Sequence, residues 1–172
     1  MTKSVLQAML LSVFLSVTAA GAADPQRQAA VASRSADVMP FSLKATTHVF
    51  TKTAEGGTQR VIAKSPDDTQ QVKLVREHLQ DIQAEFSKGD FSGPSHVHGT
   101  EMPGLAALKA AKPGEIAIAY KRVVGGAELT YRTNNAKLVA ALHQWFEAQL
   151  SDHGTDAMAG HQHGQRSTPS SP

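Results

Sequence analysis

The chain has 172 residues, enough for one domain of ordinary size and too few for two. Its 17 lysine and arginine residues against 15 aspartate and glutamate residues give a formal net charge of +2. No dense basic cluster occurs, so we expect no nucleic-acid partner. Because the chain has no cysteine, disulfides, thiolate metal sites and cysteine nucleophiles are excluded. Eight histidine residues are the compositional outlier.

The N-terminal segment has the three parts of a secretory signal peptide. Lys3 supplies a positive start, residues 5–17 are predominantly apolar, and Ala20-Gly21-Ala22 is a small-x-small cleavage site. The apolar run is shorter than the ~20 residues that a bilayer core requires. We therefore expect residues 1–22 to be removed, leaving a periplasmic or secreted chain that begins at Ala23 or Asp24 and has no membrane attachment.

Composition divides the mature chain into three parts. Residues 23–40 are polar and alanine-rich without a clear period, which indicates a flexible lead-in. Residues 154–172 are rich in glycine, serine and proline and carry His161 and His163, which is typical of a disordered tail. A single domain is expected between them, over residues 41–153.

The first half of this domain predicts a hairpin followed by a helix. Residues 43–53 and 58–64 are rich in β-branched residues, and the glycines of the intervening 54–57 permit a turn. Ser65-Pro66 is typical of a helix start. Gly89 ends the helix. Before it, apolar residues recur every three or four positions, at Val72, Val75, Leu79, Ile82 and Phe86.

The second half repeats this order after a short helix predicted at 105–111. Strands are expected at 115–122 and 127–133, and Asn134 or Asn135 caps a last helix with an apolar stripe that ends at Leu150. The elements run ββα-α-ββα. We therefore expect an α+β fold of two layers, in which helices cover one face of a four-stranded, mostly antiparallel sheet.

His96-Val97-His98 is the first candidate metal-binding segment. In an extended loop, residues two apart point the same way, so both imidazoles could face one ion. Met102 adds a thioether close behind. Histidine with methionine suits copper, and histidine with carboxylate suits zinc or nickel. A structural role for one of the two imidazoles is the alternative.

Three other histidines are candidate ligands. His143 and Glu147 lie four apart and share a helix face, although a boundary histidine is the more ordinary interpretation of His143. His48 lies on the first strand, and His153 follows Asp152 at the end of the last helix. We expect a specific metal site to be centred on His96 and His98 and completed by Met102 or His153.

The sequence also resembles a group of small exported bacterial proteins, some labelled aspartate carbamoyltransferase. The resemblance rests on four motifs: Thr47-His48-Val49-Phe50, Gly89-Asp90-Phe91-Ser92, His98-Gly99-x-x-Met102-Pro103-Gly104 and His143-x-Trp145-Phe146-x-Ala148-Gln149-x-x-Asp152-His153-Gly154. Transcarbamoylases have a much longer two-domain chain and a Ser-Thr-x-Thr-Arg phosphate loop, and this chain has neither. The resemblance therefore implies no activity and no catalytic residue.

The leading functional hypothesis is a non-catalytic exported protein that binds copper, zinc or nickel through histidine. A ligand- or protein-binding module is the second, and a hydrolase or transferase that uses a His/Glu pair or His98 is the third. No Gly-x-Ser-x-Gly, P-loop or EF-hand motif supports an enzyme. Clustering of three or more candidate ligands would favour metal binding, and a pocket enclosing an imidazole–carboxylate pair would favour an enzyme.

Overall fold

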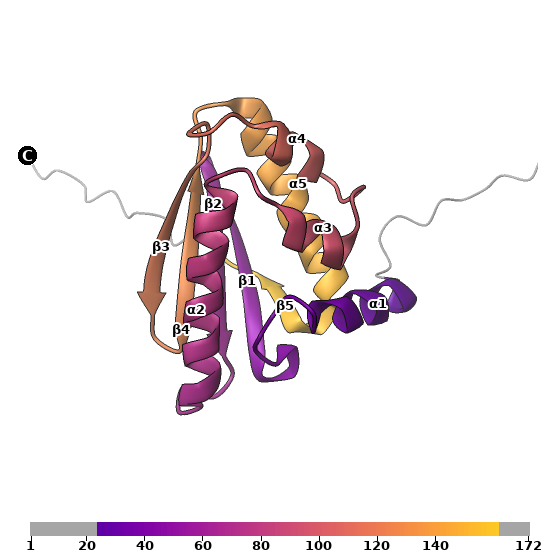
Figure 1. Cartoon of the computed structure of the whole chain (residues 1–172), viewed down its shortest axis with the longest axis vertical. Coiled ribbons are helices and arrows are strands. Elements are labelled where there is room, and N and C mark those ends of the chain that lie inside the picture. Colours follow the sequence, from indigo (N-terminus) through magenta and orange to yellow (C-terminus); the bar gives the residue numbers. More distant parts are fainter. Residues whose placement is uncertain (1–23, 162–172) are drawn as a thin grey trace, which may run out of the picture.

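The computed structural model describes residues 24–161, and the predicted signal peptide and residues 162–172 lie outside this range. Within it, the strands form one mixed five-stranded sheet in the order β3-β4-β2-β1-β5. The α+β class is confirmed, with a fifth strand added (Figure 1).

The strands are β1 (Thr46–Thr53), β2 (Gly56–Ala63), β3 (Ala117–Val123), β4 (Gly126–Arg132) and β5 (Ala157–Ala159). The helices are α1 (Pro25–Ser35), α2 (Thr69–Phe86), α3 (Ser92–His98), α4 (Leu105–Ala110) and α5 (Ala136–His153), with short 3-10 turns at Leu43–Ala45 and Gly154–Asp156.

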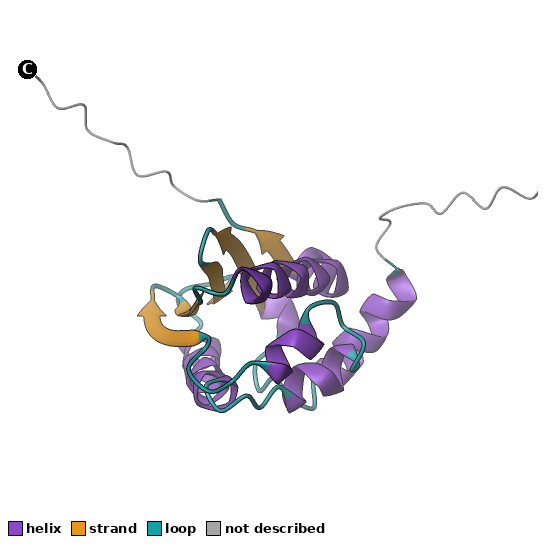
Figure 2. Ribbon diagram, turned by 90° about the horizontal axis from the view of Figure 1, so that it is seen from above, coloured by secondary structure: helices purple, strands orange, loops and turns teal. Residues whose placement is uncertain are grey.

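The two expected hairpins supply four of the five strands of the sheet. β1 pairs with β2 and β3 pairs with β4, both antiparallel, and β2 joins the hairpins by pairing antiparallel with β4. Side chains alternate across each strand, so Thr46, His48 and Phe50 are buried on the helix-covered face while the residues between them are partly exposed. α2 and α5 pack on that face, an arrangement that Figure 2 shows from above.

The helix ends follow local capping chemistry. α2 begins at Thr69 rather than at Ser65, because the Asp68 carboxylate accepts a hydrogen bond from the backbone N–H of Gln71. Pro66 instead lies in the turn before the helix. Asn135 caps α5 by accepting from the N–H of Lys137. Within residues 24–161, no helix is both long enough and apolar enough to cross a membrane.

The core is rich in aromatic side chains and lies between the sheet and α5. Phe86 and Phe146, which end the apolar stripes of α2 and α5, are both at most 5 % exposed. Trp145 is 1 % exposed and contacts the rings of Phe86, Phe91 and Tyr131 edge-on. These contacts connect α2 and the segment before α3 to α5.

Order extends beyond the expected domain at both ends. Within the expected flexible lead-in, residues 25–35 form α1, which is capped by Asp24. Within the expected tail, residues 157–159 form β5, which pairs parallel with β1. α1 lies against α3 and the end of α5 (Figure 1). Its side chains bind backbone carbonyls on both neighbours, since Gln28 donates to Ser151 and Arg34 donates to Val97.

Gly104 lies where α4 contacts α5, and we expect that its replacement is tolerated poorly. It has φ +79°, and a Cβ there would lie 2.1 Å from the carbonyl oxygen of Ala141. Gly114 has a similar φ of +85° but nothing within 4 Å of its Cβ position. Both Gly→Ala variants carry the strain of a positive φ, about 1–3 kcal/mol, but only Gly104→Ala must also push two helices apart.

We therefore expect Gly104→Ala to lower the free energy of unfolding more than Gly114→Ala, by roughly a further 1–3 kcal/mol of overpacking. Urea denaturation followed by circular dichroism measures both variants. Equal losses would mean that α4 does not pack against α5 as described.

Candidate functional site

Four histidine side chains from different elements surround one small cavity. His48 lies on β1, His78 on α2, His98 at the end of α3 and His153 at the end of α5. They line a cavity of about 40 Å³. The ring centroids of His48 and His153 are 5.0 Å apart, and those of His98 and His153 are 5.1 Å apart. We refer to these four residues as the histidine cluster.

Helix termination places two of the four imidazoles. His98 and His153 are each the last residue of a helix, and each is followed by a glycine with positive φ, Gly99 at +89° and Gly154 at +53°. Glycine adopts this conformation without the steric cost that a Cβ imposes. The third imidazole, that of His48, points into the cluster because β1 buries alternate residues.

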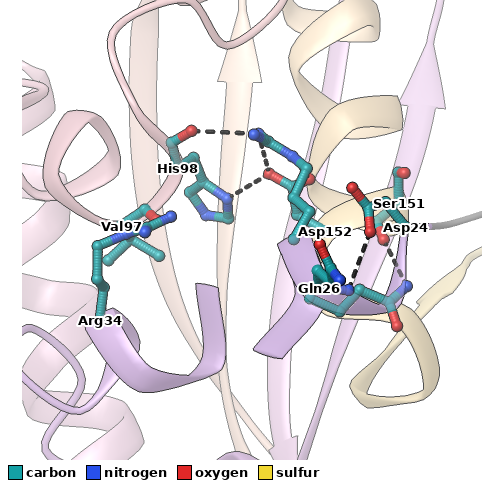
Figure 3. A network of polar contacts seen from close by, with 9 residues as sticks. Asp24, Gln26, Arg34, Val97, His98, Ser151 and Asp152 are labelled. Atoms are coloured by element: carbon teal, nitrogen blue, oxygen red, sulfur yellow. Dashed lines mark hydrogen bonds and ion pairs between the residues drawn. The ribbon is translucent and has the colours of Figure 1, made fainter. Parts of the chain in front are cut away.

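A buried ionic network fixes the orientation of His98. Its Nδ1 lies 2.8 Å from Oδ2 of Asp152, and both side chains are at most 3 % exposed (Figure 3). Arg27 of α1 donates from Nη2 to the same carboxylate at 2.7 Å and to the backbone carbonyl of His98 at 3.1 Å. α1 therefore connects α3 to α5 through a single guanidinium group.

Asp152 is held as a carboxylate within this network. Burial alone would raise the pKa of Asp152, but the hydrogen bonds from His98 and Arg27 outweigh burial and lower it. An ionised carboxylate only accepts hydrogen bonds. Nδ1 of His98 is consequently the protonated nitrogen, and in the neutral ring Nε2 bears the lone pair.

Several polar atoms at the cavity have no hydrogen-bond partner among the described residues. They are His48 Nδ1, His153 Nε2, Gln149 Oε1 and Trp145 Nε1. Leaving such a buried atom unpaired costs about 1–3 kcal/mol. A cavity needs only about 10–15 Å³ to hold one water, so this one has space for a small polar ligand. The cluster is thus polar, buried and incompletely satisfied.

Burial keeps most of the histidine cluster neutral. Desolvation lowers the pKa of His48 and of His78 to about 4 and that of His153 to about 2. Their mutual proximity adds to the effect on His48 and His153. Neutral imidazole is the form that coordinates metals and accepts hydrogen bonds.

An outer cleft lies on the other side of His98. It encloses about 720 Å³ and is lined by residues that include Arg27, Glu101, Met102 and Asp152. His98 is the only described residue that lines both this cleft and the histidine cavity. His98 and Asp152 therefore both border the outer cleft, and His98 also borders the inner cavity.

The structure separates the two histidines of the His96-x-His98 motif. Residues 92–98 form α3 rather than an extended segment, so the two side chains do not point the same way. His96 is about half exposed and pairs with Asp37, whereas His98 is buried against Asp152. Met102 is buried and lines the outer cleft, not the inner cavity.

His143 and Glu147 likewise have separate partners. His143 Nε2 lies within hydrogen-bond distance of the backbone carbonyls of Thr53 and Gly56 at the first hairpin, and Glu147 pairs with Lys52. Sequence reasoning missed His78, although its spacing from Val75 and Ile82 places it on the buried side of α2.

No set of three or more histidine, aspartate or glutamate side chains in residues 24–161 is already arranged around one point as metal ligands. No protein-family model, curated protein or solved structure matches the chain.

The histidine cluster predicts an acid-labile fold. The unfolded chain protonates histidine near pH 6.5, but the folded protein binds those protons only near pH 4 or below at His48, His78 and His153. The unfolded state therefore takes up more protons as pH falls, and the free energy of unfolding of the metal-free protein should decrease between about pH 6.5 and 4.

In His153→Gln, unfolding should take up about one proton fewer within that window. The slope of the unfolding free energy against pH should therefore fall by roughly 1.4 kcal/mol per pH unit. His96→Gln, which replaces an exposed histidine, is the matched control for a His→Gln change as such. Urea unfolding at a series of pH values measures both variants, and an unaltered slope in His153→Gln would contradict the buried, neutral state of that ring.

Proposed function

We propose that the chain binds a transition-metal ion, copper or zinc, through His48, His98 and His153. The observation that carries this proposal is the group of three buried imidazoles, two with unpartnered ring nitrogens, beside one cavity. Buried polar atoms normally have partners. A bound cation would give these nitrogens the partner that the protein itself does not supply.

The spacing of the rings suits a shared ion. Metal–nitrogen bonds of about 2.0–2.1 Å at tetrahedral angles place imidazole centroids roughly 5 Å apart. The two measured separations, 5.0 and 5.1 Å, agree with that value. The rings of His48 and His153 are nearly parallel, at 3°, so binding requires them to turn about χ2, a broad torsion for histidine.

The surroundings of the rings favour the form that binds metal. Asp152 fixes the proton of His98 on Nδ1, which is the carboxylate–histidine arrangement found around many metal sites. The backbone of Asp156 hydrogen-bonds to His48, whose Nδ1 has no partner. The bond to Asp156 therefore uses Nε2 and leaves the Nδ1 lone pair available.

The outer cleft offers a route to the site. His98 separates this cleft from the inner cavity, and Met102 and Glu101 in the cleft carry atoms that can contact a metal ion in passing. An ion that entered here would reach the inner cavity past His98, the residue that lines both.

Metal titration of the untagged mature chain tests the proposal. Copper(II) or zinc at 100 times the dissociation constant should stabilise the folded state by about 2.7 kcal/mol, which appears as a raised melting temperature. This protection should disappear in His98→Gln and in His153→Gln. It should persist in His96→Gln, which changes an exposed imidazole on the same helix as His98.

The histidines of the C-terminal segment need their own control. A variant with His161→Gln and His163→Gln removes the second His-x-His motif and should keep the thermal protection. Loss of protection in this variant, with protection retained in His98→Gln, would place the metal outside the histidine cluster and contradict the proposal.

Acid–base catalysis at the outer cleft is the second candidate function. It is favoured by one observation, that the residues lining the cleft include His98 and Asp152, an imidazole hydrogen-bonded to a buried carboxylate as in many general bases. A chain that shows no metal protection and binds an organic ligand with His98 in the cleft would support this function instead.

We also propose that the protein acts after export, since residues 1–22 have the pattern of a signal peptide. Protein purified from the periplasm or the medium should have the intact mass of a chain beginning at Ala23 or Asp24. A mass that retains Met1 would contradict this proposal.

A further inference from the structure

Met39 is the methionine that lines the histidine cavity. This residue lines the same cavity as His48, His98 and His153 and packs against the hydrophobic core. Its backbone is fixed by a 2.8 Å hydrogen bond from its N–H to the carbonyl of Ser35 at the end of α1. Met102, by contrast, lies in the outer cleft. The two methionines are therefore on different sides of His98.

The charge of the cavity wall is the second observation. None of the residues that line the inner cavity is aspartate, glutamate, lysine or arginine. Asp152, the nearest carboxylate to the cluster in the described hydrogen bonds, lines the outer cleft instead and is paired with Arg27. An ion in the cavity would thus be surrounded by side chains without a formal charge, partly apolar and partly histidine, glutamine and methionine.

Such a wall favours an ion of low charge. The cost of moving an ion from water into a medium of low dielectric grows with the square of its charge, so a dication without an anionic ligand is penalised more than a monocation. Thioether and imidazole ligands without water or carboxylate also suit copper(I), whereas zinc sites with three protein ligands usually retain a water.

We propose that the ion bound at the histidine cluster is copper(I), with the sulfur of Met39 completing the set formed by His48, His98 and His153. This inference rests on the proposed function, because it specifies the ion and the fourth ligand of the same site. It also assigns distinct roles to the methionines, with Met39 a ligand and Met102 outside the site.

A chelator competition measures copper(I) binding directly. The untagged mature chain is titrated anaerobically, with ascorbate present, into the coloured copper(I) complex of bicinchoninate, and the loss of colour reports transfer to the protein. We expect the wild type to remove one copper(I) ion per chain. Met39→Leu, which conserves volume, should weaken binding about tenfold or more, the scale seen even for a lost outer-shell partner. Met102→Leu is the matched control and should bind like the wild type.

X-ray absorption at the copper edge gives a second measurement that needs no variant. The copper(I)-loaded wild type should show sulfur together with imidazole nitrogen in the first coordination shell. A shell of nitrogen and oxygen alone, or unchanged affinity in Met39→Leu, would overturn the assignment of Met39.

The outcomes separate this inference from the proposed function. If zinc or copper(II) protects the fold through His98 and His153 but copper(I) stays with the chelator, the ion is not copper(I) and the proposed function stands. If none of the three ions binds to the histidine cluster, both proposals fail.

Discussion

The carboxylate of Asp152 is the constraint on which the site depends, because a charge that is 3 % exposed must be paired. Its partners come from two other helices, Arg27 near the start of α1 and His98 at the end of α3. Satisfying this one charge therefore brings three helices together. It also sets the tautomer of His98, the residue that lines both the outer cleft and the histidine cavity. The half-exposed guanidinium of Arg27 allows the cation to remain hydrated on one side.

The positions of His48 and His153 follow from the connection of α5 to β5, the strand that pairs with β1. The register of β5 beside β1 places Ala157 opposite His48, only four residues after His153. The turn at Gly154–Asp156 therefore returns the chain from the end of α5 to the strand that pairs with β1 beside His48. Asp156 in this turn also holds His48 through its backbone. One short connection thus positions two of the candidate ligands and fixes the tautomer of one.

Local patterns were sufficient to predict the two hairpins, the stripe of α2 and an asparagine cap at residue 134 or 135, since each depends on neighbours in sequence. They failed where the structure is determined by distant partners. α1 has one fully buried apolar side chain, Val31, and its side chains make polar contacts to both neighbouring helices, so hydrophobic periodicity gave no signal. The Asp24-Pro25 pair, a cap followed by proline at the first helical position, could have revealed this helix. The pairing of Asp152 with His98 spans 54 residues and has no sequence signature at all.

The histidine cluster is also where the structure departs from the rules that the core otherwise follows. Elsewhere the interior is filled mainly by aromatic and aliphatic side chains. Here unpaired nitrogens, two glutamines and a tryptophan N–H meet in a cavity, and each unpaired atom lowers the stability of the folded state. Sequences that are otherwise consistent with their fold tend to break such rules at functional sites. Binding a ligand that pairs these atoms would recover that free energy by mass action, so the destabilised metal-free fold and the affinity for an ion are two consequences of the same arrangement.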